Sequence, residues 1–216
     1  APAEYLEKLF TEAISEPSVV ALSIGTRPDC LPDEVIELLA RLNRRKPVWV
    51  ELGLQTIHED TARYIRRGYG LGVYEDALRR LKAAGITVIV HVILGLPGES
   101  RERMMATIDY LGGVHRPNGV KLQLLHVLEG TDLAQEWRAG RIPVMEPGEY
   151  YDLLCECIRR LPPDMVIHRL TGDGPKRILL APQWTGDKKR VLNDLNRELE
   201  RQHVRQGERY QMKNEE

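Results

Sequence analysis

The strongest constraint on this chain is a regular alternation between short β-branched apolar runs and segments of helical periodicity. Five runs have the composition of buried strands: residues 19–24, 48–54, 86–94, 120–127 and 165–170. Between the first two runs, apolar residues recur at the spacing of one helix face, namely Val35, Leu38, Leu39 and Leu42. Strands that alternate with helices form βαβ units, so the sequence predicts an α/β protein with a parallel sheet.

Length, charge and cysteine content narrow the class of protein. The 216 residues suffice for one sizeable core, and 42% of them are apolar. Lys and Arg (31) balance Asp and Glu (32), which argues against a domain that holds nucleic acid through bulk positive charge. No run of about 18 apolar residues occurs, so no membrane partner is expected. The 3 cysteines are too few for a disulfide framework, which indicates a reducing cytoplasm.

Polar and glycine-rich segments follow the predicted strands. Because the carboxyl ends of parallel strands meet at one rim, these segments are expected to come together there, where α/β proteins bind their ligands. The segments are residues 25–29, 55–56, 95–99, 126–131 and 171–174. No Gly-x-Gly-x-x-Gly follows a strand, which argues against a dinucleotide-binding fold. The sequence therefore predicts a ligand site of another kind at this rim.

Four strings at this rim occur in a fixed order: residues 26–29, 50–56, 67–68 and 91–98. Together they resemble the radical S-adenosylmethionine (SAM) enzymes, and most closely the bacterial proteins related to the catalytic subunit of elongator, which modifies tRNA. The resemblance covers residues 1–182 and implies a parallel (β/α) partial TIM barrel of the (β/α)6 type. Residues 183–216 would then form a C-terminal helix and a polar tail.

The resemblance also implies that SAM lies across the strand ends. Gly95 and Leu96 match the motif whose backbone meets the adenine. Gln55 and Arg67 match polar contacts to SAM, and a guanidinium suits a carboxylate. The remaining implied positions are polar groups that face the cofactor, a ribose neighbour and the strand edge beside the adenine: Thr26, Arg27, Glu51, His91, His126 and Val127. No catalytic residue is assigned.

The iron–sulfur part of the resemblance is missing from this sequence. Radical SAM enzymes hold a [4Fe-4S] cluster through three closely spaced cysteines, whereas Cys155 and Cys157 have the wrong spacing and Cys30 stands alone. The motif for the SAM amino group is also missing. The resemblance therefore implies a barrel that lacks its first one or two βα units, with the cluster ligands in a segment absent from this chain.

The activity implied for the full protein is reductive cleavage of SAM to a 5′-deoxyadenosyl radical. Such an enzyme needs an electron donor such as flavodoxin or ferredoxin and a substrate, for which tRNA is a candidate. This chain alone is expected to be inactive, because reductive cleavage needs iron to coordinate SAM.

Two other functions stay open from the residues alone. A zinc-dependent barrel hydrolase or aldolase would draw its ligands from His91, His126, His168, Glu51 and Asp173. A non-catalytic RNA-binding module is the other alternative, by analogy with the elongator-like proteins. Each site residue also has a structural explanation: Arg27 with Asp29 could form a surface ion pair, and Glu51 could form an ion pair inside the barrel.

Overall fold

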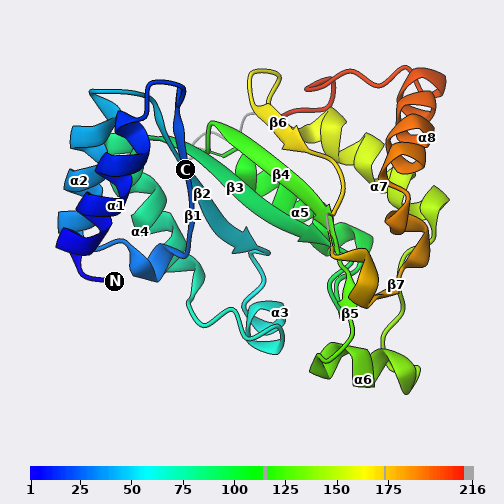
Figure 1. The fold of residues 1–216 in the computed structure, drawn as a ribbon. Coiled ribbons are helices and arrows are strands. Elements are labelled where there is room, and N and C mark those ends of the chain that lie inside the picture. Colours follow the sequence, from blue (N-terminus) through cyan, green and yellow to red (C-terminus); the bar gives the residue numbers. More distant parts are fainter. Residues whose placement is uncertain (114–115, 173, 212–216) are drawn as a thin grey trace.

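Five parallel strands form the main sheet of the protein. The computed structural model describes residues 1–113, 116–172 and 174–211. The strands are β1 (Leu22–Thr26), β2 (Val48–Gln55), β3 (Thr87–Leu94), β4 (Gly119–Leu124) and β6 (Val166–Arg169), and they pair in that order (Figure 1). Sequential order and parallel pairing are those of a barrel wall, although the described strands do not close into a barrel. The predicted partial barrel is therefore confirmed.

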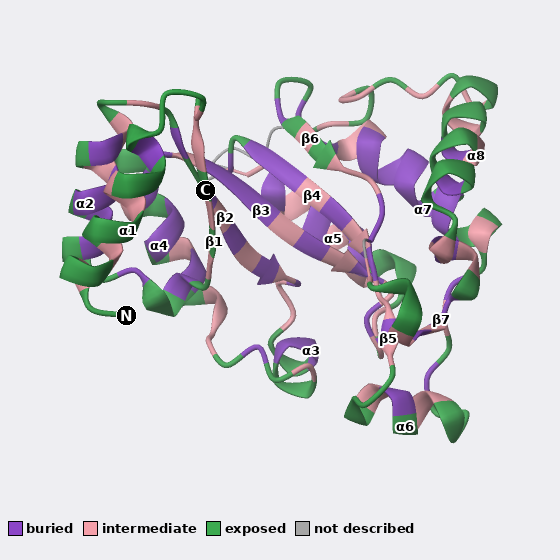
Figure 2. Cartoon of the chain, in the orientation of Figure 1, coloured by how far each residue is buried: buried purple, intermediate pink, exposed green. Residues whose placement is uncertain are grey.

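Helices cover one face of this sheet and leave the other open. The long helices are α1 (Ala3–Ser15), α2 (Asp33–Asn43), α4 (Leu71–Ala83), α5 (Arg101–Leu111), α7 (Pro147–Arg160) and α8 (Lys188–Arg201). On β2, Val48, Val50, Leu52 and Leu54 are fully buried, whereas Trp49, Glu51, Gly53 and Gln55 alternate with them and are more exposed (Figure 2). Since side chains alternate across a strand, one face of β2 builds the core and the other faces the open side.

Local sequence signals explain where the helices begin and end. The predicted apolar stripe of α2 is buried, with Leu38 and Leu39 each 1% exposed. Gly85 follows α4 with a φ of 72°, a left-handed conformation that favours glycine at a helix end. Ser100 caps α5, because its hydroxyl accepts a hydrogen bond from the Arg103 backbone N–H.

The fourth predicted strand is shorter than expected. It ends at Leu124, and Val127 belongs to a separate strand, β5 (Val127–Leu128), which pairs antiparallel with β7 (Leu179–Ala181). Helix α6 (Asp132–Arg138) follows β5. Its Ala134 belongs, with Val127 on β5 and Ala181 on β7, to a small second apolar cluster. Strands this short leave no periodic signal in the sequence, so the prediction of one continuous strand over 120–127 was wrong.

Short helical segments complete the described chain: α3 (Glu59–Tyr64) after β2, and the 3-10 turns η1 (Pro28–Cys30), η2 (Lys176–Ile178) and η3 (Gln183–Gly186). In α8, Val191 and Leu195 are part of the main core. After α8 the chain returns across the protein, where Gln206 donates to the carbonyls of Pro162 and Met165 at 2.7 Å. No helix among the described residues is both long enough and apolar enough to span a bilayer.

Gly119 tests how tightly the open face is packed at the start of β4. A Cβ at this position would lie 2.7 Å from the His168 ring and 2.8 Å from the Val166 carbonyl oxygen. Gly119→Ala is therefore expected to lower the free energy of unfolding by about 1–3 kcal/mol through overpacking. Gly148→Ala on α7, where a Cβ meets nothing within 4 Å, is the control. Urea denaturation measures both, and equal stability of the two variants would contradict this packing.

Candidate functional site at the strand ends

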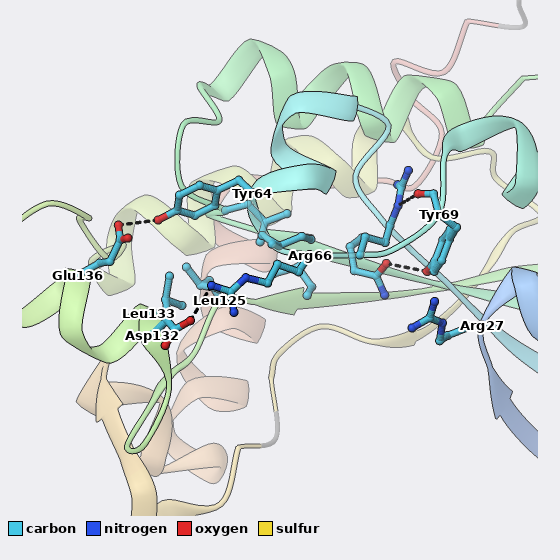
Figure 3. A pocket seen from close by; sticks show the side chains of 13 residues that line it. Arg27, Tyr64, Arg66, Tyr69, Leu125, Asp132, Leu133 and Glu136 are labelled. Atoms are coloured by element: carbon cyan, nitrogen blue, oxygen red, sulfur yellow. Dashed lines mark hydrogen bonds and ion pairs between the residues drawn. The ribbon is translucent and has the colours of Figure 1, made fainter.

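A cavity of about 640 Å³ lies at the carboxyl ends of β2, β3 and β4 (Figure 3). Its apolar wall consists of Ile65, Ile93, Leu96, Leu125 and Leu133. Polar side chains gather at its two ends, with Arg27 and Tyr69 at one and Tyr64, Asp132 and Glu136 at the other. The volume and the mixture of an apolar wall with a few polar groups are typical of a small-molecule site.

Arg67 lines this cavity, yet its guanidinium is occupied by the backbone. Nη1 donates to the carbonyls of Leu54 at 2.9 Å and Thr56 at 2.7 Å, and Nε donates to the carbonyl of Tyr69 at 2.9 Å. The side chain is only 2% exposed. These contacts fasten the end of β2 to the loop after α3. The role of direct SAM contact that the resemblance implies for Arg67 stays a prediction, and the geometry shows a structural one.

Gln55 is the last residue of β2 and lies between Leu54 and Thr56, the two residues whose carbonyls accept from Arg67 Nη1. Its φ of 63° is left-handed, which is uncommon outside glycine and costs energy. The pairing of β2 with β3 shifts register between Gly53 and Gln55 at the same place. The strand end is therefore bent, and the Gln55 side chain lines the cavity.

Tyr69 lies at the centre of this end of the cavity, and the sequence analysis did not identify it. Two guanidinium groups stack on its ring, with Cζ of Arg67 5.0 Å and Cζ of Arg27 5.4 Å from the ring centroid. Its hydroxyl is 3.1 Å from the Gly53 carbonyl and 3.3 Å from Gln55 Oε1, and can donate to either. Burial raises the pKa of Tyr69, so the phenol stays a donor at neutral pH. Its only sequence signal is its place just after Arg67 and Gly68.

Arg27 forms the ion pair that the structural explanation anticipated. Its Nε and Nη2 contact the two carboxylate oxygens of Asp29 at 2.9 and 2.7 Å. The hydrogen bond from Arg27 lowers the pKa of Asp29. Because the Arg27 side chain is 53% exposed and lines the cavity, it also has donors left for a ligand. The neighbouring Thr26 does not line the cavity, and its implied contact to the cofactor stays a prediction.

Two polar contacts join α3 and its following loop to α6 across the cavity. The Tyr64 hydroxyl donates to Glu136 at 2.8 Å, and Arg66 pairs with Asp132 at 2.7 Å (Figure 3). Arg66 also has a left-handed φ of 55°. These four residues could not be recognised in the sequence, because α6 was not predicted and its contacts join segments far apart in the chain.

Glu51 and His91 belong to a separate polar network on the open face of the sheet. The Glu51 carboxylate accepts hydrogen bonds from Lys121 Nζ at 2.5 Å, His91 Nε2 at 2.8 Å and Ser23 Oγ at 2.9 Å. Gln123 Nε2 lies 3.0 Å from His91 Nδ1, so the amide donates there and the histidine proton is on Nε2. Both ring nitrogens of His91 are thus occupied.

Charge in this network is balanced between Glu51 and Lys121. Burial acts to raise the pKa of Glu51, but the hydrogen bonds from Lys121, His91 and Ser23 outweigh it and lower the pKa to about 2. Burial lowers the pKa of His91, which keeps the ring neutral at pH 7. Neither residue lines the cavity, so the structure shows the interior ion pair that was the alternative for Glu51. The implied contacts of Glu51 and His91 to SAM stay predictions.

The remaining implied residues surround the loops after β3 and β4. Gly95 has a φ of 80° and turns the chain so that Leu96 enters the cavity wall. His126 is packed against two glycines, since a Cβ on either Gly172 or Gly174 would lie 2.5 Å from its ring. Val127 is fully buried in β5. His126 and Val127 do not line the cavity, and their place beside the adenine stays a prediction.

The described residues include no group of three or more His, Cys, Asp or Glu that could hold a metal ion. Cys155 and Cys157 are buried on α7, and burial raises the pKa of both thiols, which disfavours the thiolate that iron needs. Cys30 is exposed at the end of η1. Asp173, one of the candidate zinc ligands, lies outside the described residues. A [4Fe-4S] cluster therefore does not fit the described part of this chain.

The Glu51 network predicts a specific loss of stability in acid. Because the pKa in the folded state is about 2 and the ordinary value is 4.5, the carboxylate stabilises the fold above pH 4.5. This contribution disappears as the pH falls from 4.5 toward 2. Glu51→Gln should cost about 1–3 kcal/mol at pH 7 and flatten this acid dependence, measured by urea unfolding across pH. Glu12→Gln, on the exposed side of α1, is the control. An unchanged acid profile in Glu51→Gln would contradict the network.

The bent backbone at Gln55 predicts an unusual substitution pattern. Gln55→Gly removes the left-handed strain and should change the free energy of unfolding by less than about 1 kcal/mol. Gln55→Val places a β-branched residue in the same conformation and should cost about 2 kcal/mol or more. Thermal unfolding compares the two variants. If valine were tolerated as well as glycine, the left-handed conformation would be wrong.

Comparison with known proteins places this chain in a family. A model of the radical SAM superfamily matches residues 2–111, and a Radical_SAM C-terminal domain model matches residues 117–201. YtqA of Bacillus subtilis is 41% identical over 216 residues, which are 100% of this chain and 67% of the relative. YhcC of Escherichia coli K12 is 35% identical over 96% of this chain and 67% of its own length. The chain thus spans about two thirds of these relatives.

The elongator-related proteins are also similar to this chain. Elongator complex protein 3 of Schizosaccharomyces pombe is 27% identical over 86% of this chain and 34% of its own length. The structure of an N-terminally deleted Elp3 of Methanocaldococcus infernus has a TM-score of 0.78, with 21% identity over 95% of this chain and 52% of that chain. Coproporphyrinogen III oxidase of E. coli shares the fold with a TM-score of 0.57, at 17% identity over 73% of this chain and 36% of that chain. The chain therefore belongs to the radical SAM superfamily.

Proposed function

We propose that this chain supplies the SAM-binding wall of a radical SAM barrel. The observation that carries the proposal is the cavity at the strand ends, which combines an apolar wall with basic and amide donors at one end. SAM has a flat adenosine at one end and a charged amino acid at the other, and it needs these two kinds of surroundings. The superfamily to which the chain belongs uses SAM at the same rim of its barrels.

In this proposal the adenosine packs against Ile93, Leu96 and Leu125, and the amino-acid end faces Arg27 and Gln55. Arg27 uses two of its donors on Asp29 and has others for a carboxylate. Gly95 itself does not line the cavity, but its left-handed φ of 80° turns the chain so that Leu96 does. Leu96 is buried, whereas Ile93 and Leu125 are half-buried and leave apolar surface for the adenine to cover.

Glu51, Lys121 and His91 have a different place in the proposal. They lie on the open face of the sheet, where Glu51 is four residues before Gln55 on β2. A substrate bound beside SAM would meet this face, and the paired charges of Glu51 and Lys121 would orient its polar groups. Their role is therefore to shape the substrate side of the barrel.

We assign the redox chemistry to the whole protein, because a cluster does not fit the described residues of this chain. In the whole protein a [4Fe-4S] cluster would supply the electron that cleaves SAM to methionine and the 5′-deoxyadenosyl radical, and flavodoxin or ferredoxin is the proposed donor that would reduce the cluster. tRNA as the substrate class is supported by the resemblance to the catalytic subunit of elongator. A reducing cytoplasm is supported by the three free cysteines. The division at residues 182 and 183 is kept as part of this proposal.

Isothermal titration of the chain with SAM tests the proposed function. We expect one SAM per chain, and we expect Ile93→Asp to weaken binding by tenfold or more, because it places a carboxylate in the apolar wall against the adenine. Val73→Asp, on the exposed side of α4, is the control and should bind as the parent does. Circular dichroism verifies that both variants fold.

Two results would contradict the proposed function. The first is the absence of SAM binding to the parent chain at millimolar concentration. The second is stoichiometric zinc in the purified chain by elemental analysis, which would favour the metal-dependent hydrolase instead.

A further inference from the structure

The backbone at Gln55 is held in its left-handed conformation by contacts on both sides. Arg67 Nη1 donates to the carbonyl before it, on Leu54, and to the carbonyl after it, on Thr56. A conformation of this kind persists only where the surroundings over-determine it, and such positions cluster at ligand sites. Arg67 is buried and reaches Gln55 only through its neighbours' backbone. Arg67 therefore fixes the backbone on both sides of Gln55, whose side chain lines the cavity.

Tyr69 contacts both Arg67 and Arg27. The Arg67 Nε bond to the Tyr69 carbonyl fixes the tyrosine backbone, and the ring contacts both guanidinium groups. The hydroxyl holds Gln55 Oε1 or the Gly53 carbonyl, which leaves Gln55 Nε2 to donate. Gln55 and Arg27 thus both contact one tyrosine and line one cavity.

Two glycines provide the space for this arrangement. A Cβ at Gly53 would lie 2.9 Å from the Tyr69 hydroxyl and 2.9 Å from Gln55 Nε2. A Cβ at Gly68 would lie 3.0 Å from Arg27 Nη2. The absence of side chains at both positions lets the tyrosine, the amide and the guanidinium come together.

We propose that Arg67 and Tyr69 are positioning residues that hold Gln55 and Arg27 as a donor pair for the carboxylate of the SAM amino-acid end. This inference rests on the proposed function and deepens it. It assigns ligand contact to Gln55 and Arg27, and assigns Arg67 and Tyr69 the task of fixing them. A carboxylate suits the pair because guanidinium and amide N–H groups both donate and the carboxylate only accepts.

The test compares SAM with 5′-methylthioadenosine, which keeps the adenosine and the sulfur but lacks the amino acid. Calorimetric titration of the full chain measures both affinities. Tyr69→Phe keeps the aromatic ring and removes the hydroxyl, so it should weaken SAM by about five- to tenfold and leave 5′-methylthioadenosine within twofold. Arg67→Lys carries its donors on a single nitrogen and loses the planar fork that reaches the carbonyls from Nη1 and Nε, so it should weaken SAM further, with the same selectivity.

Tyr110→Phe is the matched control. Tyr110 lies on α5 and does not line the cavity, and its hydroxyl donates to Glu75 on α4 at 2.8 Å. The substitution should not change the ratio of the two affinities. If Tyr69→Phe weakened both ligands equally, or weakened neither, the ratio of the two affinities would stay that of the parent chain and the inference would be overturned. A parent chain that binds both ligands equally would also overturn it. A parent chain that binds neither ligand would instead refute the proposed function, and the inference with it.

Discussion

The hydrogen bonds between the Arg67 guanidinium and three backbone carbonyls are the interaction on which the cavity depends. A buried guanidinium is costly unless its donors are satisfied. Here carbonyls at the bent end of β2 and in the loop after α3 accept from Nη1 and Nε, and Nη2 faces the Glu59 carboxylate at 3.5 Å. The same bonds stabilise the left-handed Gln55, which would otherwise relax. The loop after α3 and the end of β2 are therefore fastened to each other beside the cavity.

Polar groups in this protein are separated by task. At the strand ends, Arg27, Gln55 and Tyr69 border a cavity with an apolar wall. Further down the open face, Glu51 and Lys121 neutralise each other, and His91 is held neutral between Glu51 and Gln123. The core face of the same strands is apolar throughout, as the buried valines and leucines of β2 show. One strand therefore contributes to the core, the charge network and the cavity through its alternation alone.

The sequence was informative wherever burial is periodic. The stripe of α2 follows from helical periodicity, and β2 and β3 were recognised as apolar runs whose predicted limits lie within one residue of those in the structure. β5 and β7 were beyond such reasoning, because two and three residues leave no period and their pairing joins segments about fifty residues apart. α6 was missed with them, and with it the contacts of Tyr64 and Arg66 across the cavity.

Individual site residues show the same limit. Four of the residues that the resemblance implies line one cavity: Arg27, Gln55, Arg67 and Leu96. The other six do not line it, namely Thr26, Glu51, His91, Gly95, His126 and Val127, and SAM binding by any of the ten stays a prediction. The sequence could not distinguish an exposed guanidinium that lines the cavity from a buried one that holds backbone carbonyls, and this distinction separates Arg27 from Arg67. Tyr69 and Lys121 were missed because their significance lies in residues that fold against them from other segments.

The most direct measurement is a crystal structure of the chain with S-adenosylhomocysteine, a stable analogue that keeps the adenosine and the amino acid. We expect density for its adenine against Leu96 and Leu125 and for its carboxylate at Arg27 and Gln55, and we expect Arg67 to keep its hydrogen bonds to the backbone carbonyls. Ligand bound elsewhere, or an Arg67 guanidinium released from its carbonyls onto the ligand, would contradict it.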